Sequence, residues 1–233
     1  MESVYTSDAI FETLKSEILF LTIKPGEPLG ESILCDRFGV SRTPARAVLQ
    51  RLHDGGLVDM IPYKGTFVTK LDYSVIDQSI YQRVALETFV MRDFIRMNNL
   101  AEHEAVRFAL YQMTEEGQKF LDNDPSFDSS RFWDFDRRMH EIWFRAVRKP
   151  YLAAQLWNAN ASYMRFCTLD IASGPCVSDV LNEHAEMLDI IGRRDEAAIE
   201  PLMKQHLYGH IRRLGTRLYT EFRDYFVEGT LLV

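Results

Sequence analysis

The chain has 233 residues, of which 46% are hydrophobic and 26% charged, a balance typical of globular proteins that excludes disordered and fibrous ones. Its formal net charge is -7, and no apolar run approaches the roughly 20 residues that cross a bilayer, so we expect a cytoplasmic protein with no membrane partner. Three cysteines without CxxC spacing favour reduced thiols over disulfides or a zinc–thiolate site, and we assign them no role.

The first residues show the spacing of an amphipathic helix. Apolar side chains recur at intervals of three and four between Ile10 and Leu21, which predicts a helix over residues 7–20. The run of proline and glycine that begins at Pro25 then ends this helix, because proline lacks an amide donor and glycine tolerates left-handed backbone. A short second helix is predicted over residues 31–38, before Gly39.

A third helix is predicted over residues 41–54. The Ser41 hydroxyl can cap its first turn, in which Pro44 is tolerated. Its apolar residues share one face, so the other side chains project away from the core. The projecting group comprises Arg42, Thr43, Arg46 and Gln50.

The next segment predicts a β-hairpin. Two short apolar stretches, residues 57–61 and 66–71, flank the turn sequence Pro62-Tyr63-Lys64-Gly65. Three helices followed by a hairpin is the order of a winged helix-turn-helix, in which the hairpin forms the wing. The third helix would then be the recognition helix, whose N-terminal side chains meet base edges in the major groove of DNA.

Positive charge is concentrated in this same segment. Between residues 37 and 70 there are six Lys or Arg and two Asp, a local balance of +4 inside an acidic chain. Because phosphate binding needs local positive charge, we expect any nucleic-acid surface here. An arginine can donate two hydrogen bonds to one guanine, so the helix supplies good readers of base edges. The predicted DNA-binding residues are Ser41, Arg42, Thr43 and Arg46, with Lys64 and Gly65 in the wing. The alternative is an ordinary surface helix with solvated arginines.

Beyond Asp72 the pattern changes to long helical periods with few breakers. We therefore expect a DNA-binding domain over residues 1–72 and a second domain over residues 73–233. The second domain is predicted to be an all-α antiparallel helical bundle, which makes the whole chain mainly α. Its expected helices cover residues 75–97, 102–121, 131–147, 151–171, 178–192 and 196–226.

Four polar side chains in this domain fall on the apolar stripes of their helices: Asp136, His140, His184 and His206. Any one histidine could be a satisfied core residue, but burying a carboxylate and three imidazoles together costs free energy unless they share a partner. One Asp and three His suit a divalent metal ion, zinc or nickel best. His210, one turn further on, is an alternative to His206.

The N-terminal segment resembles the DNA-binding domain of the GntR family of bacterial regulators over about residues 7–70. The resemblance rests on Lys24-Pro25-Gly26-Glu27-Pro28-Leu29, Phe38-Gly39-Val40-Ser41-Arg42-Thr43-Pro44-Ala45-Arg46, Leu49-Gln50-Arg51-Leu52, Gly56-Leu57-Val58 and Gly65-Thr66-Phe67-Val68. It implies DNA contacts at Arg42, Thr43 and Arg46 and in the wing. Ala45 stands where valine is usual and Ala47 where glutamate is usual, so we expect the preferred operator to differ from those of relatives.

The second domain resembles the FCD effector domain of the FadR subfamily. The matching stretches are Tyr81-Gln82-Arg83-Val84-Ala85-Leu86-Glu87, Asp136-x3-His140, Glu183-His184, Arg194-Asp195 and Met203-Lys204-Gln205-His206. In metal-binding members of the subfamily, the aspartate and the three histidines at these positions hold the ion. The resemblance therefore implies Asp136, His140, His184 and His206 as its ligands. Relatives commonly sense small organic or sugar acids whose carboxylate completes the coordination. Arg83 is a candidate effector-binding residue for such an anion, or else a salt-bridge partner.

These features predict a ligand-responsive transcriptional regulator: a repressor that a small carboxylate effector releases from double-stranded operator DNA. As a homodimer it would place two recognition helices ~34 Å apart. A metal-dependent hydrolase is the alternative, although HExxH, GxSxG and phosphate-loop motifs are missing. Its conceivable bases Glu141, Glu183 and Glu186 have helical phases that put none clearly beside the ligands. A third reading is an architectural DNA-binding protein that senses nothing. We do not expect an enzyme.

Overall fold

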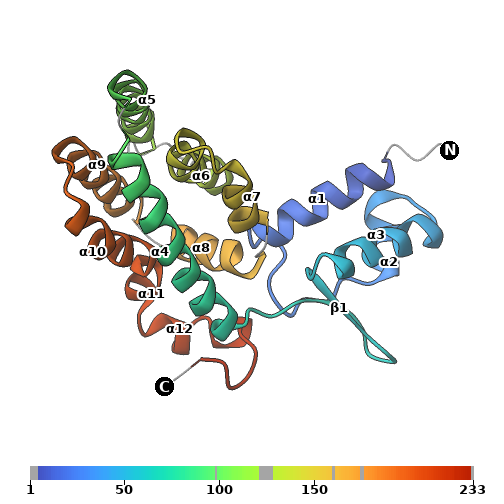
Figure 1. Ribbon diagram of the computed structural model, residues 1–233. Coiled ribbons are helices and arrows are strands. Elements are labelled where there is room, and N and C mark those ends of the chain that lie inside the picture. Colours follow the sequence, from blue (N-terminus) through green and yellow to red (C-terminus); the bar gives the residue numbers. More distant parts are fainter. Residues whose placement is uncertain (1–4, 98, 121–127, 159–160, 174–175, 232–233) are drawn as a thin grey trace.

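The computed structural model describes residues 5–97, 99–120, 128–158, 161–173 and 176–231. These residues are mainly helical and form two hydrophobic cores, one from the N-terminal elements and one from the remaining helices. In Figure 1 the N-terminal elements lie on one side and the helical bundle on the other. None of the described helices is long and apolar enough to cross a membrane.

The N-terminal part has the predicted fold, a three-helix unit with a β-hairpin wing. Its antiparallel hairpin pairs Val58 with Val68 and Ile61 with Gly65. The inward faces of its helices bury Leu14, Leu34 and Leu49 completely. The elements are α1 (Ser7–Leu19), α2 (Glu31–Phe38), α3 (Arg42–Asp54), β1 (Val58–Ile61) and β2 (Gly65–Val68).

Two local details of this unit differ from expectation. Ser41 occupies the N-cap position of α3, but its hydroxyl makes no capping hydrogen bond, so the predicted side-chain cap is wrong. In the wing, Lys64 N donates to Ile61 O at 3.1 Å, and the left-handed residue inside that turn is Tyr63, with a φ of 63°. Gly65 does not close the turn, because it is the first residue of β2, with a φ of 115°.

The bundle is more segmented than the periodicity predicted. Residues 151–171, expected as one helix, are helical on both sides of residues 159–160, which lie outside the described residues, as do Leu121 and residues 122–127 of the expected connector. A clear break lies further on. The expected helix over residues 196–226 breaks after Leu207 and again at Gly215, whose backbone (φ 49°, ψ -130°) is not helical. The elements are α4 (Tyr73–Ile95), α5 (Leu100–Gln118), α6 (Ser129–Ala146), α7 (Pro150–Asn158), α8 (Ala161–Ser173), α9 (Val177–Arg193), α10 (Glu196–Leu207), α11 (Gly209–Leu214), α12 (Arg217–Thr220) and the short 3-10 helix η1 (Arg223–Tyr225).

Helix α4 runs through the bundle and packs against α6, α8 and α10 (Figure 1). Helix α5 closes the bundle against α6 and α9. This last contact depends on Gly117, since a Cβ there would lie 2.5 Å from Leu181 Cδ2 and 2.7 Å from Phe135 Cζ. The packing places the inward faces of α4, α6, α9 and α10 around a common interior.

Candidate metal centre and nucleic-acid interface

Three helices bring four metal-ligand side chains together inside the bundle. Helix α6 supplies Asp136 and His140, α9 supplies His184 and α10 supplies His206. One ligand atom from each of the four lies within 4.8 Å of all the others. The three histidines are buried, and Asp136 is nearly so. The four side chains that the sequence analysis placed on separate inward stripes therefore meet at one point, the polar cluster.

Two carboxylates outside the polar cluster orient two of its histidines. Glu87 of α4 contacts Nδ1 of His140, and Glu183 of α9 lies 2.8 Å from Nδ1 of His206. Since an ionised carboxylate only accepts hydrogen bonds, each Nδ1–H donates, and each Nε2 is left for a partner inside the polar cluster. The two Nε2 atoms face each other at 3.0 Å.

The protonation states agree with this arrangement. Burial opposes ionisation of Glu87, but Arg83 and His140 outweigh it and lower the pKa of Glu87 to about 2. Burial lowers the pKa of His206 to about 4, so its imidazole is neutral near pH 7. Burial also disfavours the Asp136 anion, yet the neighbouring histidines hold the pKa of Asp136 well below its ordinary value. The polar cluster thus presents an ionised Asp136 carboxylate beside the neutral imidazole of His206.

Two imidazoles of the polar cluster turn their Nε2 atoms toward each other. At 3.0 Å these two nitrogens need either a proton between them or a cation that both coordinate. Both ring nitrogens of His184 are buried without a hydrogen-bond partner among the described residues, although Nε2 lies 3.2 Å from Asp136 Oδ1. At a metal–nitrogen distance of about 2.05 Å, neighbouring ligand atoms are ~2.9 Å apart in octahedral and ~3.3 Å apart in tetrahedral coordination. The pairs at 3.0 and 3.2 Å are close to these values, and one carboxylate with three imidazoles is a donor set that suits zinc or nickel.

Arg83 connects the polar cluster to a ring of aromatic side chains. Its Nε donates to Glu87 Oε1 at 2.6 Å and its Nη1 to the Tyr163 hydroxyl at 2.5 Å, while the guanidinium lies 4.3 Å from the Trp157 ring. The salt-bridge alternative for Arg83 is thus present, yet its Nη2 is buried without a partner among the described residues. The indole N–H groups of Trp157 and Trp143 are also buried without a partner among the described residues, and both rings lie near His140.

His210 is not part of the polar cluster. Its Nδ1 lies 2.8 Å from Asp170 Oδ2, which also accepts from Arg213, so His206 and not His210 faces His140. Glu87 was not among the predicted site residues, and the prediction that helical phase leaves Glu183 away from the ligands is wrong. The sequence contains a signal for each carboxylate: Glu183 directly precedes His184, and Glu87 lies one helical turn after Arg83.

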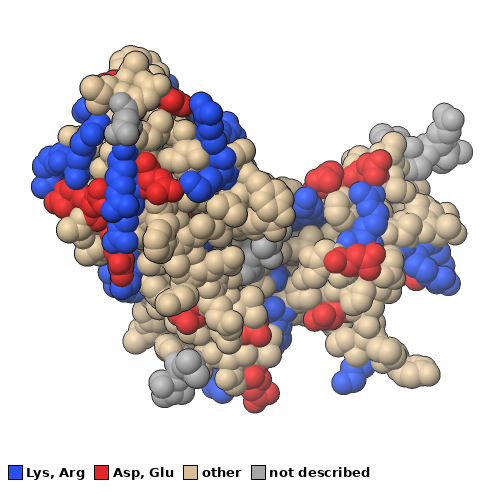
Figure 2. Space-filling view, in the orientation of Figure 1, with Lys and Arg blue, Asp and Glu red and all other residues tan. Residues whose placement is uncertain are grey.

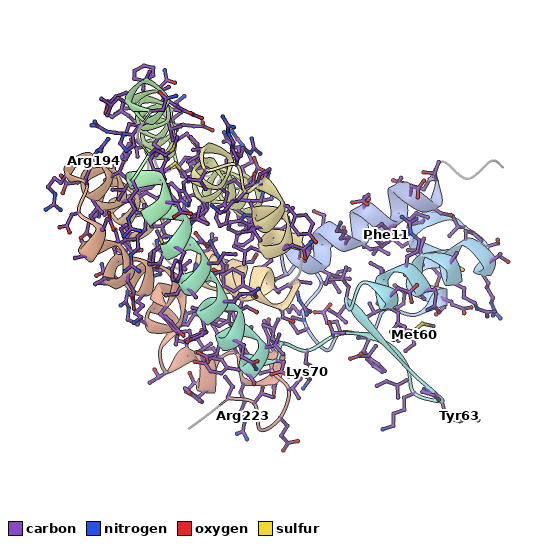
Figure 3. The ribbon with its side chains drawn as sticks, in the orientation of Figure 1. Phe11, Met60, Tyr63, Lys70, Arg194 and Arg223 are labelled. Carbon is purple, nitrogen blue, oxygen red and sulfur yellow. The ribbon has the colours of Figure 1, made fainter. Side chains whose placement is uncertain are left out.

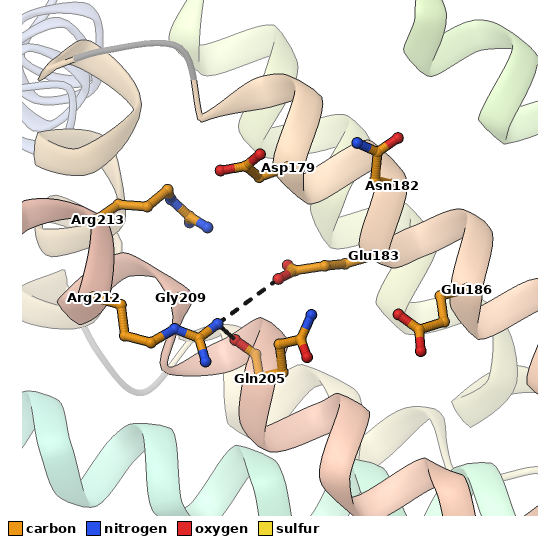
Figure 4. Close-up of a pocket in the computed structure, with 8 residues that line it drawn as sticks. All are labelled: Asp179, Asn182, Glu183, Glu186, Gln205, Gly209, Arg212 and Arg213. Carbon is orange, nitrogen blue, oxygen red and sulfur yellow. Dashed lines mark hydrogen bonds and ion pairs between the residues drawn. The ribbon is translucent and has the colours of Figure 1, made fainter.

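The outer side of Glu183 borders a surface pocket of about 300 Å³ (Figure 4). Residues of α9 line one wall and residues of α10 and α11 the other: Asp179, Asn182, Glu186, Gln205, Gly209, Arg212 and Arg213. Arg212 lies 3.9 Å from Glu183 Oε1 and also donates to the Gln205 carbonyl. One carboxylate thus separates the polar cluster from this pocket.

The predicted DNA-reading side chains lie on the surface of the N-terminal unit. Ser41, Arg42, Thr43 and Arg46 are exposed at the start of α3, and Lys64 and Gly65 are exposed in the wing. Tyr63 extends from the wing tip into solvent, fully exposed (Figure 3).

Three of the six basic residues between residues 37 and 70 form ion pairs with carboxylates. Arg46 donates from Nε to Glu31 Oε1 at 2.7 Å, and Arg37 and Arg51 pair with Glu17 and Asp8. Figure 2 shows acidic and basic groups intermingled over the visible face of the unit. The local count of +4 therefore overstated the positive surface, because it omitted carboxylates that precede residue 37 in the sequence.

Comparison with known proteins identifies both parts of the chain. Residues 6–68 match the description "Bacterial regulatory proteins, gntR family", and residues 80–209 match "FCD domain". The HTH-type transcriptional repressor RspR of Escherichia coli K12 is 26% identical over 94% of this chain and 92% of its own. The galactonate operon transcriptional repressor of the same strain is 28% identical over 89% of this chain and 96% of its own.

Solved structures show the same fold. The Escherichia coli protein McbR/YncC superposes with a TM-score of 0.61 at 17% identity, covering 94% of this chain and 99% of its own. A GntR regulator from Rhodococcus sp. RHA1 gives 0.61 at 19% identity, covering 90% and 97%. The family and its relatives are transcription regulators and not enzymes, which removes the hydrolase alternative. This chain belongs to the GntR family of bacterial regulatory proteins, with an FCD domain following its helix-turn-helix.

Proposed function

We propose that the protein is a transcriptional repressor whose operator affinity is lowered when a small organic or sugar acid binds beside a metal ion in the bundle. Residues 1–72 would bind the operator and residues 73–233 would sense the acid. The observation that carries the proposal is the polar cluster, in which two Nε2 atoms face each other at 3.0 Å beside buried hydrogen-bond donors that have no partner among the described residues.

Asp136, His140, His184 and His206 would hold the ion, zinc or nickel. FCD domains commonly bind a metal, which supports this assignment. Glu87 and Glu183 would orient His140 and His206. The bound ion would supply a positive centre that attracts an anionic ligand.

The surroundings of the polar cluster favour a carboxylate as that ligand. Next to the four cluster residues, Arg83 Nη2 and the indole N–H groups of Trp143 and Trp157 are donors without partners among the described residues, and a carboxylate is an acceptor only. Arg83 would therefore be an effector-binding residue while keeping its bond to Glu87. The repressor of the galactonate operon is named for a sugar acid, which supports the same ligand class.

Helix α4 offers a surface for the proposed homodimer. Tyr81 and Phe89 are 71% and 67% exposed and lie two turns apart on one face, with the small residue Ala85 exposed between them. Two copies related by a two-fold axis could meet with the alanines opposed and each tyrosine against a phenylalanine. Such pairing would place two recognition helices on a pseudo-palindromic operator.

The test is the metal content of the purified protein together with a thermal-shift screen of organic and sugar acids. We expect about one divalent ion per chain and an acid that raises the melting temperature. His184→Ala should lose both effects, whereas His53→Ala, which removes a histidine of α3, should keep them. No metal and no stabilising acid in the unmodified protein would refute the sensor and leave a DNA-binding regulator.

A further inference from the structure

The short linker between the wing and the bundle is held from two sides. On the first side, Arg165 of α8 donates from Nη1 to Thr69 O at 2.6 Å and from Nη2 to Thr69 Oγ1 at 3.0 Å. Thr69 is itself bonded to the start of the wing, through its hydroxyl to Gly56 O at 2.9 Å and its amide to Leu57 O at 3.0 Å. A bundle side chain therefore binds the residue at which the chain leaves the DNA-binding unit.

Arg165 is an unusual residue for this place. It is fully buried, and burial lowers its pKa to about 10, although the Asp59 carboxylate acts in the opposite direction. A buried guanidinium loses its hydration, which is offset here mainly by the Thr69 oxygens and the Ala161 carbonyl. The bundle is thus connected to the linker by a side chain whose burial costs hydration free energy.

On the second side, the C-terminal segment pairs with the linker as a short strand. Leu71 N donates to Tyr225 O at 2.8 Å and Val227 N donates to Leu71 O at 2.9 Å, forming a parallel bridge between Leu71 and Phe226. Leu71 and Phe226 are both buried. This segment follows residue 209, where the match to the FCD domain ends.

The two sides meet on α8. The ring of Phe226 packs against Phe166, the residue after Arg165, with centroids 6.4 Å apart. Lys70 of the linker and Arg223 of the C-terminal segment lie close together at the foot of α4 and line one surface cavity of about 650 Å³ (Figure 3). The linker therefore runs between α8 and the end of the chain.

Helix α8 also contacts the proposed effector site. Tyr163, two residues before Arg165, accepts a hydrogen bond from Arg83 Nη1, and Arg83 reaches the polar cluster through Glu87. Arg83 and Thr69 are thus bonded to side chains of the same helical turn. A small rotation or shift of α8 would change both contacts together.

We propose that Arg165 and residues 225–227 form a clasp on the linker, and that this clasp transmits occupancy of the bundle site to the DNA-binding unit. The transmission rests on the proposed function, whereas the clasp itself can be tested without it. Arg165 acts here as a positioning residue. When the clasp opens, the linker can move. The recognition helix then no longer keeps the orientation that the bundle contacts impose.

The first experiment uses the metal-free full chain and two independent variants. Arg165→Met removes the bonds to Thr69, and Val227→Pro removes only the amide that bonds to Leu71 O. Proline is compatible there because Phe226 has extended backbone (φ -102°, ψ 152°). Arg145→Met, which removes an exposed arginine of α6, is the control.

Limited trypsin digestion, read by mass spectrometry, measures cleavage after Lys70. We expect cleavage on the order of tenfold faster in both clasp variants, as for the loss of one or two hydrogen bonds, and unchanged in the control. Circular dichroism melts verify that the bundle of each variant is folded. Cleavage at the unmodified rate in both clasp variants would overturn the clasp.

The second experiment measures hydrogen exchange with and without Zn²⁺. In the unmodified protein and the control, Zn²⁺ should slow exchange in α6 and α10 and also in the linker; in the clasp variants it should slow exchange in α6 and α10 alone. A linker response that persists in both clasp variants overturns the transmission. If Zn²⁺ changes nothing in α6 and α10 of the unmodified protein, the metal proposal fails, transmission from that site fails with it, and the trypsin result alone decides the clasp.

Discussion

Glu183→Gln should weaken metal binding without unfolding the bundle. The Glu183 carboxylate lies 2.8 Å from His206 Nδ1. A hydrogen bond to a charged group contributes about 1.5–3 kcal/mol and a neutral one about 0.5–1.5 kcal/mol, so the substitution should cost about 1 kcal/mol of orientation energy. Changes to groups that orient metal-bound histidines typically weaken metal binding about 10- to 100-fold. Because glutamine keeps an oxygen that can accept the bond, we expect a loss near the lower limit, about tenfold.

The assay is a competition titration of Zn²⁺ against a chromophoric chelator. Glu186→Gln is the matched control, because Glu186 lies one turn further along α9, lines the same surface pocket and is exposed. The control should bind Zn²⁺ like the unmodified protein. The reasoning is refuted if Glu183→Gln binds equally well, or if both variants lose affinity equally.

Three further predictions concern other parts of the molecule. Arg42→Ala should weaken binding to an operator selected from random DNA by about 1–3 kcal/mol in a gel-shift titration, and an unchanged affinity would exclude Arg42 as a base reader. Burial opposes charge on His210, but Cys167 and Asp170 raise its pKa to about 10. The stability that this shift contributes is present below pH 6.5 and is lost as the pH rises through 10. The melting temperature of His210→Gln should therefore decrease less from pH 7 to 10 than that of the unmodified protein. Gly117→Ala should lower the free energy of unfolding in urea by about 1–3 kcal/mol, because the new Cβ would meet a leucine carbon at 2.5 Å, and an unshifted midpoint would contradict the close packing of α5.

Periodicity predicted the helices well where one apolar stripe faces one core. It failed at Gly215, because apolar residues continue at helical spacing across this position although its backbone is not helical. Such a break depends on what the two halves pack against, which a local pattern does not contain.

Inward phase was sufficient to select the four residues of the polar cluster, since each must face the same interior. It was insufficient for Glu87 and Glu183, whose long side chains reach histidines on other helices from the edges of their own stripes. The charge count failed for a related reason. Arg46 meets Glu31 and Arg51 meets Asp8 across 15 and 43 residues of sequence, distances over which a local sum sees no pair.

The ion pair between Arg46 and Glu31 bears on how the protein would search a genome. An arginine that already has a carboxylate gains little from a random phosphate, because one charged partner replaces another. In the proposed operator contact, a correctly placed guanine would accept two hydrogen bonds from Arg46. That interaction would be stronger than the ion pair with Glu31 that it replaces. If Arg46 makes the proposed contact, this pairing and the net charge of -7 would both weaken binding to unrelated DNA and so shorten the time spent on it.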